Sequence, residues 1–147
     1  AIDDNSFFLR DIFQKGYRSL FDCFYLEMLR GLHEKYGAKF VLNIYFTTGD
    51  DFNLNQFPDR YRGEWKDNAD WLKLAFHAHA DQPARPYQNA PAAEVARDFE
   101  QVGQQIVRFA GEEVCTPPTV IHCHALSRRA RLTPWVQEQC AWHCRVT

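Results

Sequence analysis

Two short segments that are apolar on both faces limit the possible folds of this chain more than any other feature. Residues 39–46 read KFVLNIYF and residues 71–76 read WLKLAF. Apolar side chains at successive positions are typical of parallel strands that are covered by helices on both sides. The segments around these two strands have helical spacing. The sequence therefore predicts an α/β fold built on a parallel sheet.

The helical segments are recognised by spacing and by the residues at their ends. Before the first strand, apolar side chains recur near helical spacing up to Gly37, which is a residue typical of helix ends; they are Phe21, Phe24, Tyr25, Met28, Leu29, Leu32 and Tyr36. Proline at the start predicts a helix over residues 58–68, and a long amphipathic pattern predicts another over residues 91–110. We also expect a strand at residues 119–123, a short helix at 133–139 and a last strand at 141–146.

The length of the chain sets how much of a barrel it can form. A complete eightfold α/β barrel needs roughly 200 to 250 residues, and this chain has 147. We expect residues 1–147 to form a single, incomplete domain, a partial (β/α) barrel without its C-terminal strands, with Ala1 and Ile2 ending the first strand. Open sheet edges and uncovered apolar surface then predict self-association or low stability.

Composition excludes some classes of partner. Hydrophobic residues make up 46% of the chain, which is enough for a packed core. The net charge is -2 and no run of like charge occurs, so we expect no nucleic-acid partner. No apolar stretch approaches the roughly 18 residues of a spanning helix, so we expect no membrane partner. Five cysteines without a C-x-x-C pair favour reduced thiols and hence a cytoplasmic location.

Carboxylates and histidines follow the predicted strands at the points where they end. Carboxyl ends of parallel strands meet at one mouth, where catalytic groups gather. Imidazole and carboxylate together suit zinc and other divalent ions, and three such ligands leave a position for water. The residues concerned are Asp3, Asp4, His77, His79, Asp81, His122 and His124.

Two of these strand ends resemble motifs of the polysaccharide deacetylases of the NodB homology family. Ile2-Asp3-Asp4 resembles their first motif, a strand ending in two aspartates, and residues 76–81 (FHAHAD) resemble their second, a strand ending in H-x-x-x-H. The resemblance implies a distorted (β/α) barrel that removes N- or O-acetyl groups from a carbohydrate with one divalent ion, zinc being the expected metal. It makes Asp3 the general base and Asp4 and His77 metal ligands. Asp81 stands where the family has its second histidine, and we expect it to be the third ligand.

Several alternatives stay open at the level of sequence. His79 or His124 could complete the metal site in place of Asp81, and His122 could be a hydrogen-bonded core histidine. Trp71 and Tyr87, near the predicted mouth, are candidate contacts to the carbohydrate. A glycoside hydrolase without metal would use a carboxylate pair, for which Asp4 and Asp81 are the candidates. A barrel without catalytic activity that binds a glycan or a protein is the non-enzymatic alternative, because the family's late motifs have no counterpart here.

Overall fold

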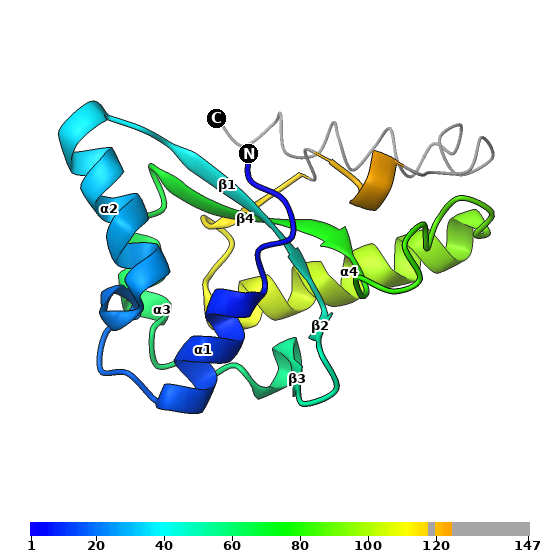
Figure 1. The fold of residues 1–147 in the computed structure, drawn as a ribbon, viewed down its shortest axis with the longest axis horizontal. Helices are drawn as coiled ribbons and strands as arrows, with labels where there is room; N and C mark the ends of the chain where they lie inside the picture. Colours follow the sequence, from blue (N-terminus) through cyan, green and yellow to red (C-terminus); the bar gives the residue numbers. More distant parts are fainter. Residues whose placement is uncertain (118–119, 125–147) are drawn as a thin grey trace.

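The computed structural model describes residues 1–117 and 120–124, and these residues form a mixed α/β structure (Figure 1). The central sheet has three parallel strands in the order β1-β4-β5. Its strands are β1 (Phe40–Tyr45), β4 (Leu72–Ala78) and β5 (Cys115–Thr116), and a separate two-stranded sheet joins β2 (Thr47–Thr48) to β3 (Phe52–Asn53). The α-helices are α1 (Phe7–Lys15), α2 (Phe24–Tyr36), α3 (Arg62–Asp67) and α4 (Ala92–Phe109), and 3-10 turns are Leu20–Asp22, Leu54–Gln56 and His122–His124.

The two long strands are buried on both faces, as their apolar sequences predict. Phe40 to Ile44 pair in register with Leu72 to Phe76, and Leu42, Ile44 and Leu74 are fully buried. The N-terminal residues join the free edge of β1 through one parallel bridge, Ile2 to Leu42. The Ile2 N–H donates to the Val41 carbonyl at 2.8 Å, and the Ile2 carbonyl accepts from Asn43 N–H at 2.9 Å. This edge pairing places Asp3 and Asp4 beside the carboxyl end of β1.

The register of β1 and β4 shifts at the end of the sheet where the strand-end residues gather. Ile44 pairs with Phe76, whereas Tyr45 pairs with Ala78, so His77 has no partner residue in β1. A β-bulge of this kind re-aims the side chain of the extra residue. Such a bulge cannot be read from the alternation of apolar and polar residues.

The core lies between the sheet and its helices and is rich in aromatic side chains. Trp65 and Phe8 are fully buried, with their rings 6.4 Å apart. Phe109 at the end of α4 packs against Phe57 at a ring distance of 4.8 Å and against Trp65 at 6.3 Å. These contacts join α1, α3 and α4 into one apolar cluster with the sheet.

Most predicted elements are present, but the strand expected at residues 119–123 is wrong, the helix expected from Pro58 begins only at Arg62, and helix α1 was not predicted. Gly37 ends α2 in the left-handed conformation, as predicted, and α4 agrees with the predicted helix to within a residue at each end. The predicted strand at residues 119–123 is wrong for its described residues, because β5 lies earlier and residues 122–124 form a 3-10 turn. Pro117, which has no N–H to give to a sheet, follows β5 directly. The helix and strand expected within residues 133–146 lie outside the described residues.

The parallel α/β arrangement therefore agrees with the sequence-based expectation, while the partial barrel stays a prediction. Within the described residues the sheet has three strands and is not closed. No helix in that part of the chain is long and apolar enough to span a bilayer.

Candidate metal centre

Three side chains from distant parts of the sequence meet at the carboxyl end of the sheet. Their ligand atoms are Asp4 Oδ1, His77 Nε2 and His122 Nδ1, all within 4.8 Å of one another. Asp4 Oδ1 lies 3.2 Å from His77 Nε2 and 3.4 Å from His122 Nδ1. The two imidazole nitrogens are 3.1 Å apart.

These distances match the spacing of ligands around a small divalent cation. Ligand atoms placed tetrahedrally 2.0–2.1 Å from zinc lie about 3.3 Å from one another. The three distances between the ligand atoms of Asp4, His77 and His122 are 3.1, 3.2 and 3.4 Å. One carboxylate and two imidazoles are also the donor set that zinc and related ions prefer. Among the described residues, this group fits a metal both in chemistry and in spacing.

The orientation of His77 is set by the backbone. Its side chain is almost fully buried, and Nδ1 lies 2.8 Å from the Val120 carbonyl oxygen. A carbonyl only accepts hydrogen bonds, so Nδ1 carries a proton, and in the neutral imidazole that binds metals the lone pair is then on Nε2, which faces Asp4. Fixing the far nitrogen by a backbone carbonyl is a common way to orient a metal-binding histidine.

Asp4 is held by an unusual backbone conformation and by a tyrosine. Its φ is +57°, in the left-handed region that non-glycine residues seldom occupy. This turn directs the Asp4 carboxylate towards the histidines, while the neighbouring Asp3 carboxylate accepts a hydrogen bond from the Asn43 amide at 2.6 Å. The Tyr45 hydroxyl donates to Asp4 Oδ1 and lies 2.8 Å from His122 Nδ1.

The electrostatics keep Asp4 ionised and Tyr45 protonated. The hydrogen bond from Tyr45 lowers the pKa of Asp4, partial burial opposes this effect, and the neighbouring histidines lower the pKa further. Burial raises the pKa of Tyr45, and the hydrogen bond to Asp4 raises it again. An anionic carboxylate is the form that binds a cation, so this arrangement favours metal binding near neutral pH.

A cleft of about 460 Å³ opens over the cluster. Asp4, Tyr45 and His122 line it, and Asp81 lines it from the loop that follows β4. The remaining lining residues come from the start of α1, the β2 region, that loop and the 3-10 turn of His122; they are Ser6, Phe7, Thr47, Thr48, Gly49, Gln82, Ala84 and Cys123. The predicted ligands Asp4 and His77 are thus brought together, whereas Asp81 lines the cleft with Asp4 without joining the three-atom group.

His122 joins the group as its third member, although the sequence favoured other residues. In sequence it was the weaker member of the pair with His124, because it fell inside an expected strand. Residues 122–124 form a 3-10 turn instead, with a φ of +55° at Cys123. The only sequence signal for this turn is the proline pair that precedes it, and the side chain of His124 lies outside the described part of the structure.

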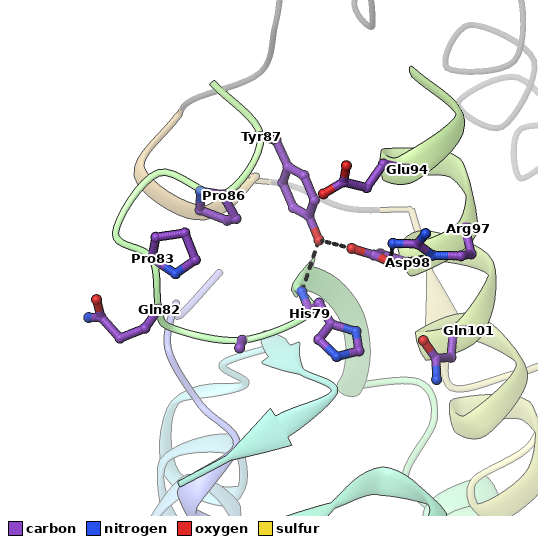
Figure 2. A pocket seen from close by; sticks show the side chains of 10 residues that line it. His79, Gln82, Pro83, Pro86, Tyr87, Glu94, Arg97, Asp98 and Gln101 are labelled. Atoms are coloured by element: carbon purple, nitrogen blue, oxygen red, sulfur yellow. Dashed lines mark hydrogen bonds and ion pairs between the residues drawn. The ribbon is translucent and has the colours of Figure 1, made fainter. Parts of the chain in front are cut away.

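His79 and Tyr87 belong to a second pocket, of about 390 Å³, between the loop after β4 and helix α4 (Figure 2). The His79 backbone N–H donates to the Tyr87 hydroxyl at 2.9 Å, and that hydroxyl donates to Asp98 at 3.0 Å. The His79 ring stacks on Phe46 at 5.0 Å. Both residues therefore anchor the loop to α4, and neither belongs to the three-atom group.

Trp71 lies at the opposite end of β4 from the cluster. Its side chain is buried, stacks on His33 at 4.6 Å and donates to Asn68 at 2.9 Å. The structure thus gives Trp71 a packing role at the amino end of the sheet and does not bring it to the cleft.

Comparison with known proteins adds no family to this description. No protein-family model, curated protein or solved structure matches the chain.

Proposed function

We propose that this chain is a metal-dependent hydrolase that removes acetyl groups from a carbohydrate. The observation that carries the proposal is the convergence of Asp4, His77 and His122 at zinc-like spacing below an open cleft. The order of the motifs resembles that of the NodB-type deacetylases and supplies the reaction type. A position in the ligand sphere left free by three protein ligands is typical of catalytic rather than structural zinc.

Asp4, His77 and His122 would hold the ion, which when bound supplies a Lewis acid that activates water and polarises an acyl carbonyl. The protein's own contribution is orientation. The Val120 carbonyl fixes the tautomer of His77, and Tyr45 fixes the rotamer of Asp4. Such outer contacts place the ligands before the ion arrives, so little ordering is needed on binding.

Two carboxylates are candidates for accepting the proton of the attacking water. The resemblance assigns this role to Asp3, whose carboxylate is held by Asn43. Asp81 lines the cleft itself, together with Asp4. A general base must reach the water directly or through one further water, so substitution of each by asparagine is needed to choose between them.

The wall of the cleft offers both polar and apolar contacts. Its wall combines the polar side chains of Thr47, Thr48 and Gln82 with Phe7, whose aromatic ring is half exposed. Sugars offer hydroxyl groups for the former and an apolar ring face for the latter. A carbohydrate substrate is compatible with this lining, and the motif resemblance supports it.

Metal content tests the centre directly. Untagged protein loaded with zinc and dialysed should contain about one equivalent by elemental mass spectrometry, and Asp4→Asn, His77→Gln and His122→Gln should each lose most of it. His79→Gln is the matched control, because His79 is close in sequence and outside the cluster. Absence of zinc from the parent protein, or equal loss in the control, would exclude the proposed centre.

Acetate release from an N-acetylated chitooligosaccharide then tests the reaction. We expect zinc-dependent release that falls at least about 100-fold in whichever of Asp3→Asn and Asp81→Asn removes the base. Cleavage of glycosidic bonds without metal would favour the alternative hydrolase, for which the shared cleft of Asp4 and Asp81 is the supporting observation. Zinc and glycan binding without either reaction would identify a binding scaffold.

We also propose that the protein works in the cytoplasm, because its described cysteines, Cys23, Cys115 and Cys123, are all free. Fractionation of the source cells would decide this, and recovery outside the cytoplasm would contradict it.

A further inference from the structure

Helix α2 carries an exposed apolar row for which the described part of the chain provides no cover. Phe24, Met28, Leu32 and Tyr36 recur every four residues, so they lie along one side of the helix. All four are exposed, Phe24 at 80% and Tyr36 at 66%. Another side of α2 packs into the core through Leu26 and Leu29. Figure 1 shows α2 at the edge of the molecule, away from α4.

A second row beside the first one has a glycine at its centre. Glu27, Gly31 and Lys35 also follow one another at four-residue spacing, and all are exposed. Glycine inside a helix costs about 1 kcal/mol relative to alanine. A Cβ added at Gly31 would meet nothing within 4 Å, so no contact within the described chain requires glycine there. Close approach of another backbone is a physical reason for such a glycine.

We propose that α2 is the interface of a two-fold homodimer in which two copies of the helix cross in antiparallel directions at Gly31. The charges on the second row favour this occupant and this orientation. An antiparallel crossing at Gly31 places Glu27 opposite the partner's Lys35, and the two-fold axis repeats that pair at the other end. A parallel crossing would place Glu27 against the partner's Glu27, and like charges would repel.

Glu27 and Lys35 make only weak interactions within their own chain, so these can be replaced by contacts to a partner. Glu27 accepts a hydrogen bond from Arg30 on its own helix, and Lys35 lies 5.0 Å from the Tyr36 ring. Exposed pairs of this kind contribute little to stability. The apolar row supplies the attraction between the copies, while the charged row sets their direction. This interface is independent of the metal centre and of the reaction proposed for it.

Sedimentation velocity of the full chain from low to high micromolar concentration is the first test. We expect a reversible change from 17.2 kDa to twice that mass. Gly31→Leu should weaken the dimer at least about tenfold, because a side chain at the crossing separates the backbones. The same substitution should raise the thermal stability of the dilute monomer, since leucine is the better helix former.

Gly103→Leu is the matched control. Gly103 lies inside α4, an added Cβ there also meets nothing within 4 Å, and its neighbours Glu100 and Gln104 are polar and hydrogen-bonded to each other. We expect this variant to associate like the parent protein. A sedimenting mass of 17.2 kDa at every concentration, or equal effects of the two glycine substitutions on association, would overturn the proposal.

A charge exchange tests the orientation. Glu27→Lys and Lys35→Glu should each weaken association about tenfold, and the double variant should return to within about threefold of the parent. Additive weakening in the double variant would contradict the antiparallel pairing.

Discussion

At the scale of single residues, the structure predicts different thiol reactivities for Cys115 and Cys123. Burial raises the pKa of the Cys115 thiol to about 11, so only about one thiol in a thousand is ionised at pH 8. Cys123 is exposed and lines the cleft. We expect iodoacetamide at pH 8 to modify Cys123 at least about tenfold faster than Cys115. Peptide mapping by mass spectrometry measures both rates in one sample, and faster labelling of Cys115 would show that β5 opens readily.

Tyr87 provides a second residue-scale prediction, on alkaline stability. Burial, followed by the charge of Asp98, raises the pKa of Tyr87 above its usual value of 10. The folded state then keeps a proton that the unfolded state releases, so the stabilisation is complete below pH 10 and is lost as the pH rises above it. Tyr87→Phe should reduce the free energy of unfolding at pH 7 by about 1–3 kcal/mol, because Asp98 loses a donor and His79 N–H an acceptor.

The same variant should also lose part of the decline in stability above pH 10. Urea unfolding at pH 7, 9 and 11 measures both effects. An unchanged free energy of unfolding at pH 7 would show that the bonds from Tyr87 to Asp98 and His79 contribute nothing.

Individual residues also show what the sequence could and could not predict about the site. Asp4 and His77 were predicted because strand ends of parallel sheets converge, which is a rule of topology. The separation of His77 from His79 depends on a register shift that involves tertiary pairing of β1 with β4. His122 depends on a turn that a local apolar pattern does not reveal. The connection of Tyr45 to Asp4 joins residues 41 positions apart and has no local signal.

At the scale of elements, the C-terminal ends of helices were more predictable than the short strand β5 or the start of α3, which begins at Arg62 rather than at Pro58. Gly37 is recognisable because the left-handed conformation at a helix end favours glycine, and its φ is +66°. The strand β5 has only two residues and forms because Val114 and its neighbours lie next to β4. Tertiary pairing therefore overrides the local preference that predicted a strand at residues 119–123.

Substituting alanine for Gly37 and for Gly103 should change the free energy of unfolding in opposite directions. Gly37→Ala should lower the free energy of unfolding by about 1 kcal/mol, because a Cβ disfavours the left-handed conformation. Gly103→Ala should raise it by up to about 1 kcal/mol, because that residue is helical and an added Cβ has free space. Chemical denaturation of dilute protein measures both. The same sign for both variants would contradict the backbone assignment of Gly37.

At the scale of the whole molecule, the aromatic cluster around Phe109 joins helices to one another as well as to the sheet. Phe109 is fully buried against Phe57 and Trp65. Phe109→Ala should lower the free energy of unfolding by about 3–5 kcal/mol. The substitution would leave a cavity between Phe57 and Trp65, and these side chains cannot both move to fill it. Phe109→Leu should cost less, since it keeps most of the apolar volume. A loss below 1 kcal/mol in the alanine variant, measured by urea unfolding, would mean that this end of the core repacks.

Because the N-terminal segment pairs only with the edge of the sheet, the metal centre can be lost without unfolding of the domain. The N-terminal residues are attached to β1 by the bridge at Ile2 and by a few further hydrogen bonds that Asp3, Asn5 and Ser6 make to it, whereas β1 and β4 are paired along their whole length. Loss of these contacts would separate Asp4 from His77 and His122, whereas the pairing of β1 with β4 does not depend on them. We expect the site to open as a local equilibrium before the domain as a whole unfolds. By linkage, a ligand that joins Asp4 to the histidines also fastens the N-terminal segment to the sheet.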